Sequence, residues 1–219
     1  LTVLEADEST RYLVLEMGAS GPGHIAYLTD IAPLDAAGVL MIGHAHMGGF
    51  GSIEGVAAAK AEIIAGLRPE GIAILNADDA RAAAMAELAP ARVLTFSARG
   101  RQADLRAENV DLDAAARAAF DLHLPGLAEP RRVQLAVAGV HNVSNALAAA
   151  GLALAAGIAP ELIAERLGSV SIESPHRMDI SELSGDLLLI DDSYNANIDS
   201  MTAALAVLPA LAGDRRRVV

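Results

Sequence analysis

The feature that most restricts the fold of this chain is an alternation of short apolar runs with helical segments through its first half. Each run is short enough for a strand buried on both faces, and each following segment has helical spacing of its apolar residues. Repeated strand–helix units predict a parallel sheet with right-handed crossovers, flanked by helices. The predicted strands are Arg11–Glu16, Ala36–Ile42, Gly71–Leu75 and Ala91–Ser97, and the predicted helices between them are His24–Ile31, Ile53–Leu67 (capped by Ser52) and Asp79–Leu88.

In the second half of the chain, the spacing of apolar residues is different. Period-two alternation over Val110–Leu112, Ala119–Leu124 and Arg132–Val137 predicts a small antiparallel sheet appended to the parallel one. Helices are expected at Gly139–Gly157 and Pro160–Leu167. The remainder predicts strands at Met178–Leu183, Leu187–Asp191 and Arg215–Val219 and a helix over Ser200–Leu211, which is the truncated start of a further α/β domain. We therefore expect two units, 1–173 and 174–219.

Composition excludes several classes of protein. With no cysteine, the 219 residues carry neither disulfides nor thiolate metal sites, which fits a cytoplasmic protein. A net charge of −12 argues against nucleic acid as a partner. No apolar run approaches the ~20 residues that a membrane helix needs. Because Leu1 is not an initiator and acidic residues interrupt the opening, no signal peptide is expected, and we expect the chain to start within a longer protein.

Lys60 is the only lysine in the chain, beside 15 arginines, and it falls within the apolar stripe of the helix that Ser52 is expected to cap. One interpretation is structural: the stem lies along the core and the ammonium pairs with a carboxylate. The other is chemical, because a desolvated lysine can lose its proton and condense with CO2 to a carbamate, which arginine cannot do. The residues alone leave both interpretations open.

Candidate metal ligands follow the first two predicted strands. Glu16 ends the first, and His44 and His46 follow the second, so all three are expected at the carboxyl edge of the sheet, where ligands bind in open α/β folds. Glycines bend the path around the histidines, so we expect only one of them to be a ligand. Each of these residues could equally be structural, as a solvated strand end or a hydrogen-bonded turn histidine.

Polar residues also gather where the helix of small residues begins. His141, Asn142 and Asn145 lie near its N-terminus, where free N–H groups and the helix dipole favour anions. An asparagine there is often simply a cap. Two asparagines three apart could also read a base edge, since each amide offers a donor and an acceptor.

Four stretches together resemble the Mur ligases, and the resemblance covers nearly the whole chain. They are EMGASGPGHIAYL (16–28), AHMGGFGSIEGVAAAKAEI (45–63), HNVSNALAA (141–149) and DDSYNANIDSMTAAL (191–205). The last stretch points to the branch that adds D-Ala-D-Ala to UDP-MurNAc-peptide. The resemblance implies a P-loop-NTPase-like central ATPase domain, followed by the start of a Rossmann-like C-terminal domain.

The resemblance also implies roles for individual residues. Glu16 would ligate the Mg2+ shared with the ATP phosphates, and His46 a second Mg2+ supported by a carbamate on Lys60. Asn142 and Asn145 would approach adenine, and Arg177 and Asp192 would contact phosphate and ribose across the hinge. The implied reaction activates a substrate carboxylate as an acyl phosphate, which the incoming amine attacks.

The family's phosphate loop, GxxGK[ST], has no counterpart in these residues, because the only lysine is Lys60. We therefore expect this stretch by itself to be an inactive part of a ligase. The alternatives are a sibling ligase that adds D-glutamate or diaminopimelate, a folylpolyglutamate synthase, a non-catalytic binding module, and a metal-dependent amidohydrolase. The last is disfavoured because Lys60 lies within a helical stripe and not at a barrel strand end.

Overall fold

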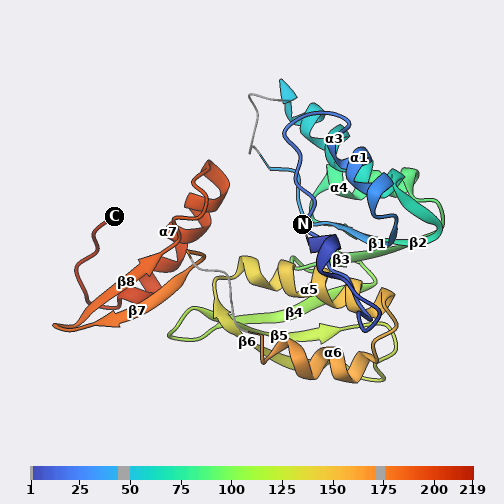
Figure 1. Ribbon diagram of the computed structural model, residues 1–219. Helices are drawn as coiled ribbons and strands as arrows, with labels where there is room; N and C mark the ends of the chain where they lie inside the picture. The colour runs from blue at the N-terminus through green and yellow to red at the C-terminus, as the bar shows by residue number, and fades with distance from the viewer. Residues whose placement is uncertain (1, 44–49, 171–175) are drawn as a thin grey trace.

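The protein is built on one six-stranded sheet in which the strands follow each other in sequence order, β1-β2-β3-β4-β5-β6. The computed structural model describes residues 2–43, 50–170 and 176–219 (Figure 1). Pairing is parallel from β1 to β4 and antiparallel from β4 to β6. The six strands are β1 (Leu34–Val39), β2 (Leu67–Asn76), β3 (Arg92–Ser97), β4 (Leu105–Leu112), β5 (Arg117–His123) and β6 (Arg131–Ala138).

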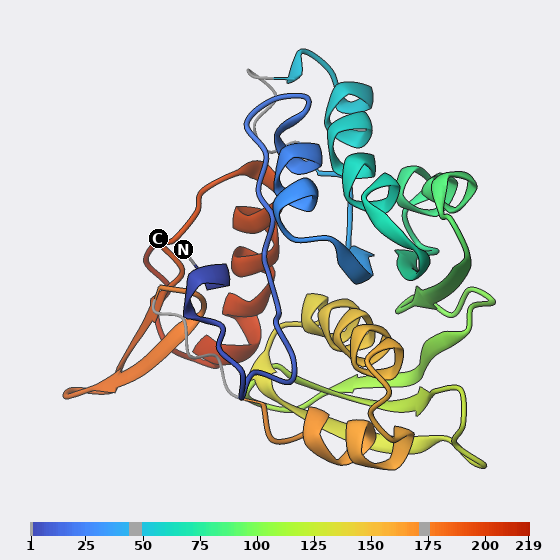
Figure 2. The same ribbon diagram turned by 45° about the vertical axis from the view of Figure 1, so that its right-hand side comes forward.

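Helices cover the sheet from both sides and create two cores. Helix α5 (His141–Ala155) and helix α6 (Pro160–Leu167) pack with β2 to β6 around Phe96, Phe120 and Leu147, all fully buried. On the other side, α3 (Ile53–Ala65) and α4 (Ala80–Ala84) pack with β1 and β2 around Ile64. Figures 1 and 2 show α5 on one side of β1–β3 and α1 (His24–Ile31), α3 and α4 on the other. Two short 3-10 helices, Thr2–Glu5 and Met85–Leu88, complete this part of the chain.

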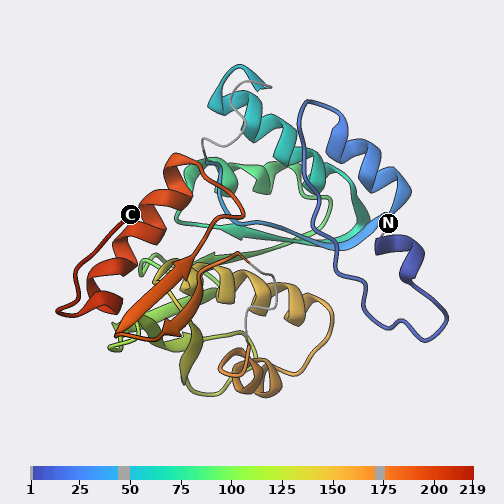
Figure 3. The same ribbon diagram turned by 60° about the vertical axis from the view of Figure 1, so that its left-hand side comes forward.

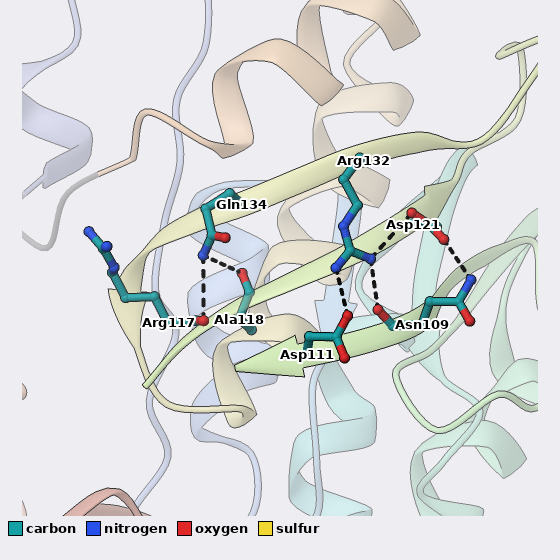
Figure 4. A network of polar contacts seen from close by, with 7 residues as sticks. All are labelled: Asn109, Asp111, Arg117, Ala118, Asp121, Arg132 and Gln134. Atoms are coloured by element: carbon teal, nitrogen blue, oxygen red, sulfur yellow. Dashed lines mark hydrogen bonds and ion pairs between the residues drawn. The ribbon is translucent and has the colours of Figure 1, made fainter. Parts of the chain in front are cut away.

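Strand β4 is irregular where it pairs with β5, and a side chain from β6 holds this irregular stretch in place. Register shifts between Glu108 and Asp111, and Asn109 has a left-handed φ of 50°. Arg132 spans this irregularity: its guanidinium donates to the carbonyl of Asn109 (2.7 Å) and to Asp111 (2.9 Å), and pairs with Asp121 at 3.3 Å (Figure 4). One side chain on β6 therefore holds the bulged strand against its neighbours.

A second, smaller unit follows residue 176. It consists of an antiparallel pair, β7 (Asp179–Leu183) and β8 (Leu187–Asp191), and helix α7 (Ile198–Ala212). Figure 3 shows α7 and the β7–β8 pair beside the β5–β6 end of the large sheet. The contact is small and apolar: buried Val207 of α7 packs with Ala116 and Ala138, and Met178 and Leu211 flank them.

Several predicted boundaries are confirmed. Helix α1 covers the predicted residues, and Ser52 caps α3 by accepting a hydrogen bond from the Gly55 N–H at 3.0 Å. Helix α6 begins with Pro160 at its first turn, as a proline without an N–H should. The segment after Asp79 is shorter and tighter than predicted, since α4 gives way to a 3-10 turn.

Two predictions about strands are corrected. Arg11–Glu16 is not a strand, because no described residue forms a ladder with it, and its apolar side chains Leu13 and Val14 are exposed. Arg215–Val219 is not a strand either, and Arg215 instead pairs with Asp186 in the β7–β8 turn at 2.7 Å. The antiparallel strands extend the parallel sheet, as predicted, because β3 and β4 pair in parallel and join the two halves.

Among the described residues, no helix is both long and apolar enough to cross a membrane.

Candidate functional site

At the carboxyl ends of β1 and β2, polar side chains that end β2 or follow it form hydrogen bonds with the backbone that follows β1. The side chain of Asn76, at the end of β2, donates to the Leu40 carbonyl at 2.7 Å, just beyond β1. Asp79, three residues later, accepts from the Ile42 N–H at 2.7 Å. Its other carboxylate oxygen accepts from the first backbone N–H groups of α4 and caps that helix. The backbone leaving β1 is thus fixed by two side chains of the next crossover.

Lys60 reaches the same place from α3. Its ammonium donates to the Met41 carbonyl at 2.9 Å, and the side chain is half-buried. Burial lowers the pKa of the Lys60 amine, and the charge of Asp79 partly opposes that shift. Among the described residues, the Lys60 ammonium thus has a backbone carbonyl as its hydrogen-bond acceptor, and the Asp79 carboxylate interacts with it electrostatically.

A second polar group forms where α5 begins. Asn142 donates to the Ala138 carbonyl at 2.8 Å, and Asn145 donates to the Asn142 side-chain oxygen at 2.9 Å. Neither caps the helix, which begins without a side-chain cap. Gly139, with φ of 104°, makes the turn from β6 into the helix. The two amides therefore share one face, as their spacing predicts.

The start of the smaller unit faces this group. Burial lowers the pKa of His141, and the Asp192 carboxylate opposes that shift, so the beginning of α5 and the segment after β8 are electrostatically coupled. Asp192 also accepts from the Met178 N–H at 3.0 Å. The guanidinium of Arg177 lies 4.1 Å from the centre of the Tyr194 ring, a cation–π contact. Asn142 and Asn145 thus lie on α5 and Arg177 and Asp192 in the smaller unit, and the interaction of His141 with Asp192 links the two groups.

The remaining predicted residues are not placed in one centre. Glu16 is exposed and follows a segment that forms no strand, so the predicted reason for its position at the sheet edge is wrong. His44 and His46 lie outside the described residues. Within the described ranges, no three His, Asp or Glu side chains gather as a metal site would require. The ligand roles of Glu16 and His46 therefore stay predictions.

Sequence reasoning missed Asn76, Asp79 and Tyr194. The signal for the first two was present, because an Asn-Ala-Asp-Asp turn directly after a buried strand lies at the edge where β1 also ends. Nothing in the residues indicated that Tyr194 would stack on Arg177, since that contact joins two ends of a hairpin.

A groove among the described residues lies elsewhere. It has a volume of about 540 Å³ and separates the β5–β6 end of the sheet from the smaller unit, with Ala136, Met178, Leu188 and Arg215 among its walls. None of the predicted site residues lines it.

Comparison with known proteins identifies the family. A family model described as the Mur ligase middle domain matches residues 1–153. The chain belongs to the Mur ligase family. It is 44% identical over 211 residues to the UDP-N-acetylmuramoyl-tripeptide–D-alanyl-D-alanine ligase of Mycobacterium tuberculosis, covering 96% of this chain and 41% of that protein. The Escherichia coli ligase of the same name is 38% identical and is covered to 48%, with 100% of this chain aligned.

Solved Mur ligase structures agree with the fold. MurF from Acinetobacter baumannii superposes with a TM-score of 0.87 at 37% identity, over 95% of this chain and 44% of that one. MurF from Thermotoga maritima, solved with ADP, gives a TM-score of 0.75 at 27% identity, over 89% and 44% of the two chains. The present chain thus spans less than half the length of these Mur ligases.

Proposed function

We propose that this chain is the central part, with the first elements of the C-terminal part, of an ATP-dependent ligase that joins D-Ala-D-Ala to UDP-MurNAc-tripeptide. The observation that carries the proposal is 44% identity to a ligase of that name across 96% of the chain. Such a ligase would act in the cytoplasm on peptidoglycan precursors, and so serve cell-wall growth, cell shape and division.

The chemistry requires a carboxylate to be activated before an amine can attack it. In the proposed reaction, the γ-phosphoryl group of ATP passes to the tripeptide carboxylate and ADP leaves. The amine of D-Ala-D-Ala then attacks the acyl phosphate, which forms the amide and releases phosphate. Positioning and charge stabilisation supply most of the catalysis in phosphoryl transfer.

The residues at the hinge fit the nucleotide. Asn142 and Asn145 would approach adenine, because their amides share one face at the start of α5 and each keeps hydrogen-bonding capacity beyond the bond between them. Arg177 would contact phosphate, and Asp192 the ribose. Arg177 and Asp192 belong to the smaller unit, whereas the two asparagines belong to α5. Movement of the smaller unit toward α5 would therefore let the protein contact both the adenine and the phosphate end of the nucleotide.

The surroundings of Lys60 fit a carbamate held by a divalent cation. The amine is half-buried and its pKa is lowered, which favours the neutral form that condenses with CO2. A carbamate there would be an anion near Asp79, and a bound cation would offset that repulsion. Two Mg2+ ions, held by Glu16 and by His46 with the carbamate, would neutralise charge developing on the phosphates and the acyl group. The contribution that the described residues support is to hold the Lys60 amine just beyond the end of β1.

The test is a ligase assay on the intact enzyme that contains this chain. Phosphate release should require ATP, UDP-MurNAc-tripeptide and D-Ala-D-Ala together, and mass spectrometry should find the pentapeptide product. Replacing D-Ala-D-Ala by D-glutamate or diaminopimelate should abolish release. Turnover with either of those amines, on their own precursors, would assign the chain to a sibling ligase instead, and no turnover with any of them would refute the proposal.

A further inference from the structure

Lys60 and Asp79 contact opposite ends of the same peptide group. The Met41–Ile42 peptide presents its C=O to the Lys60 ammonium, which donates at 2.9 Å. Its N–H donates to the Asp79 carboxylate at 2.7 Å. A carboxylate that accepts from the N–H of an amide makes the carbonyl of that amide a stronger acceptor, because chains of hydrogen bonds polarise one another.

Asp79 is itself held so that this carboxylate oxygen faces β1. Its other oxygen accepts from the backbone N–H groups of Arg81 and Ala82 at 2.9 and 3.1 Å, which caps α4. The two oxygens therefore have separate tasks, one in the cap and one on the Ile42 N–H. Asn76 adds a second restraint on the same backbone through its 2.7 Å bond to the Leu40 carbonyl.

We propose that Asp79 is a positioning residue for Lys60, acting through the Met41–Ile42 peptide. It orients that peptide so that its carbonyl fixes the lysine amine at the strand ends. The inference deepens the proposed function, since the amine it fixes is the one proposed to carry the carbamate. The contacts themselves do not depend on the reaction.

Asp79→Asn is the variant that separates the two tasks of the side chain. Asparagine is as good an N-cap as aspartate, so its oxygen can keep the cap of α4. The NH2 group then replaces the oxygen that faced the Ile42 N–H, and an amide nitrogen cannot accept that bond. Asp104→Asn is the matched control: it removes the same charge from a carboxylate that accepts from Thr95, on β3.

The experiment measures amine acylation at one fixed pH in the intact ligase, read at the peptide that contains Lys60. That peptide is unambiguous because Lys60 is the only lysine in these 219 residues. We expect Asp79→Asn to raise the labelling rate about fivefold or more, since the amine loses its fixed acceptor. Hydrogen exchange at Ile42 should quicken in the same variant. In the ligase assay, kcat should fall about tenfold or more while KM for ATP stays within about twofold. Asp104→Asn should leave all of these values near those of the parent.

Labelling of Asp79→Asn at the parental rate would overturn the inference, and so would faster labelling without faster exchange at Ile42, because charge alone would then explain it. Faster labelling and exchange with an unchanged kcat would also overturn it. Labelling and exchange need no turnover. If they change as expected in a protein that makes no pentapeptide, the proposed function fails and the Asp79–Lys60 arrangement stands.

Discussion

At the scale of single residues, Lys60 is the clearest case of a side chain whose sequence position and surroundings agree. A lysine in an apolar stripe loses solvation, and the structure gives it one backbone acceptor and a carboxylate at longer range. Arginine fills every other cationic position, where reversible loss of a proton is not needed.

Replacing Lys60 tests whether its amine does chemistry. Lys60→Arg retains the positive charge but cannot carry CO2, and Lys60→Met retains only the apolar stem. We expect either change to lower pentapeptide synthesis by the intact ligase on the order of 100-fold or more, with the circular dichroism spectrum unchanged. Undiminished turnover in either variant, measured with CO2 excluded, would show that no carbamate is involved.

Within the smaller unit, Asp191 is the residue whose pKa the structure shifts most. Its carboxylate accepts from the Ser193 hydroxyl at 2.7 Å and pairs with His176, also at 2.7 Å. The bond with His176, followed by those from Ser193, lowers the pKa of Asp191 from 3.8 to about 2. The unfolded chain therefore takes up this proton at a higher pH than the folded chain.

The resulting prediction concerns acid stability. The contribution of Asp191 is fully present above pH 3.8 and is lost as the pH falls from there through about 2. In Asp191→Asn the urea midpoint should be lower than in the parent at pH 5, and the gap should narrow as the pH falls through this window. Asp214→Asn serves as the control for charge. A gap that stays constant with pH would contradict the assignment.

At the scale of elements, α5 depends on small residues that let it approach the sheet. Gly151 faces Ile74 of β2 so closely that a Cβ there would lie 2.8 Å from the Ile74 Cγ2. Ile74 is fully buried and branched at Cβ, so it cannot turn aside cheaply. A glycine in mid-helix, normally a cost of about 1 kcal/mol relative to alanine, is here a packing requirement.

Gly151→Val should therefore destabilise the protein by about 2 kcal/mol or more, through overpacking against β2. The matched change on the exposed side of the same helix, Ala149→Val, should cost only about 0.6 kcal/mol, from helix propensity. Urea unfolding of both variants measures the difference. Equal losses would mean that the helix can move away from β2 without penalty.

At the scale of the whole molecule, a small apolar cluster joins the two units. Val207 is the one residue of α7 that is fully enclosed, and it packs against two alanines from the β5 and β6 end of the sheet. Interfaces of this kind between units of one chain commonly allow relative motion. Under the proposed function, this contact would let the smaller unit move toward the nucleotide and away from it again.

Val207→Asp should release α7 from the large sheet, because burying an unpaired carboxylate there would cost several kcal/mol. We expect proteolysis within α7 to quicken at least about fivefold, while the core around Phe96 keeps its protection from hydrogen exchange. Val207→Ile keeps the apolar contact and should be cut at the parental rate. Unchanged cleavage in Val207→Asp would place the stabilising contact elsewhere.

The sequence alone determined the features that depend on residues close together in the chain. Ser52 and Pro160 mark the starts of helices, because the serine hydroxyl can accept from a free helix N–H and proline has no N–H to leave unpaired. Asn142 and Asn145 are three residues apart, so they share a face on any helix. The spacing of apolar residues also located the strands of the large sheet, because side chains alternate between the two faces of a strand. The motifs further indicated the Mur ligase family, which the match over residues 1–153 confirms.

Tertiary structure decided everything that depends on partners distant in sequence. Arg11–Glu16 has the composition of a strand, but a strand exists only where another chain segment accepts its hydrogen bonds. Pairing also decided which parallel strand the antiparallel half joins, because β4 pairs in parallel with β3. Likewise, the acceptor of Lys60 became known only when β1, α3 and the turn after β2 met, because no local pattern encodes a contact between residues 41, 60 and 79.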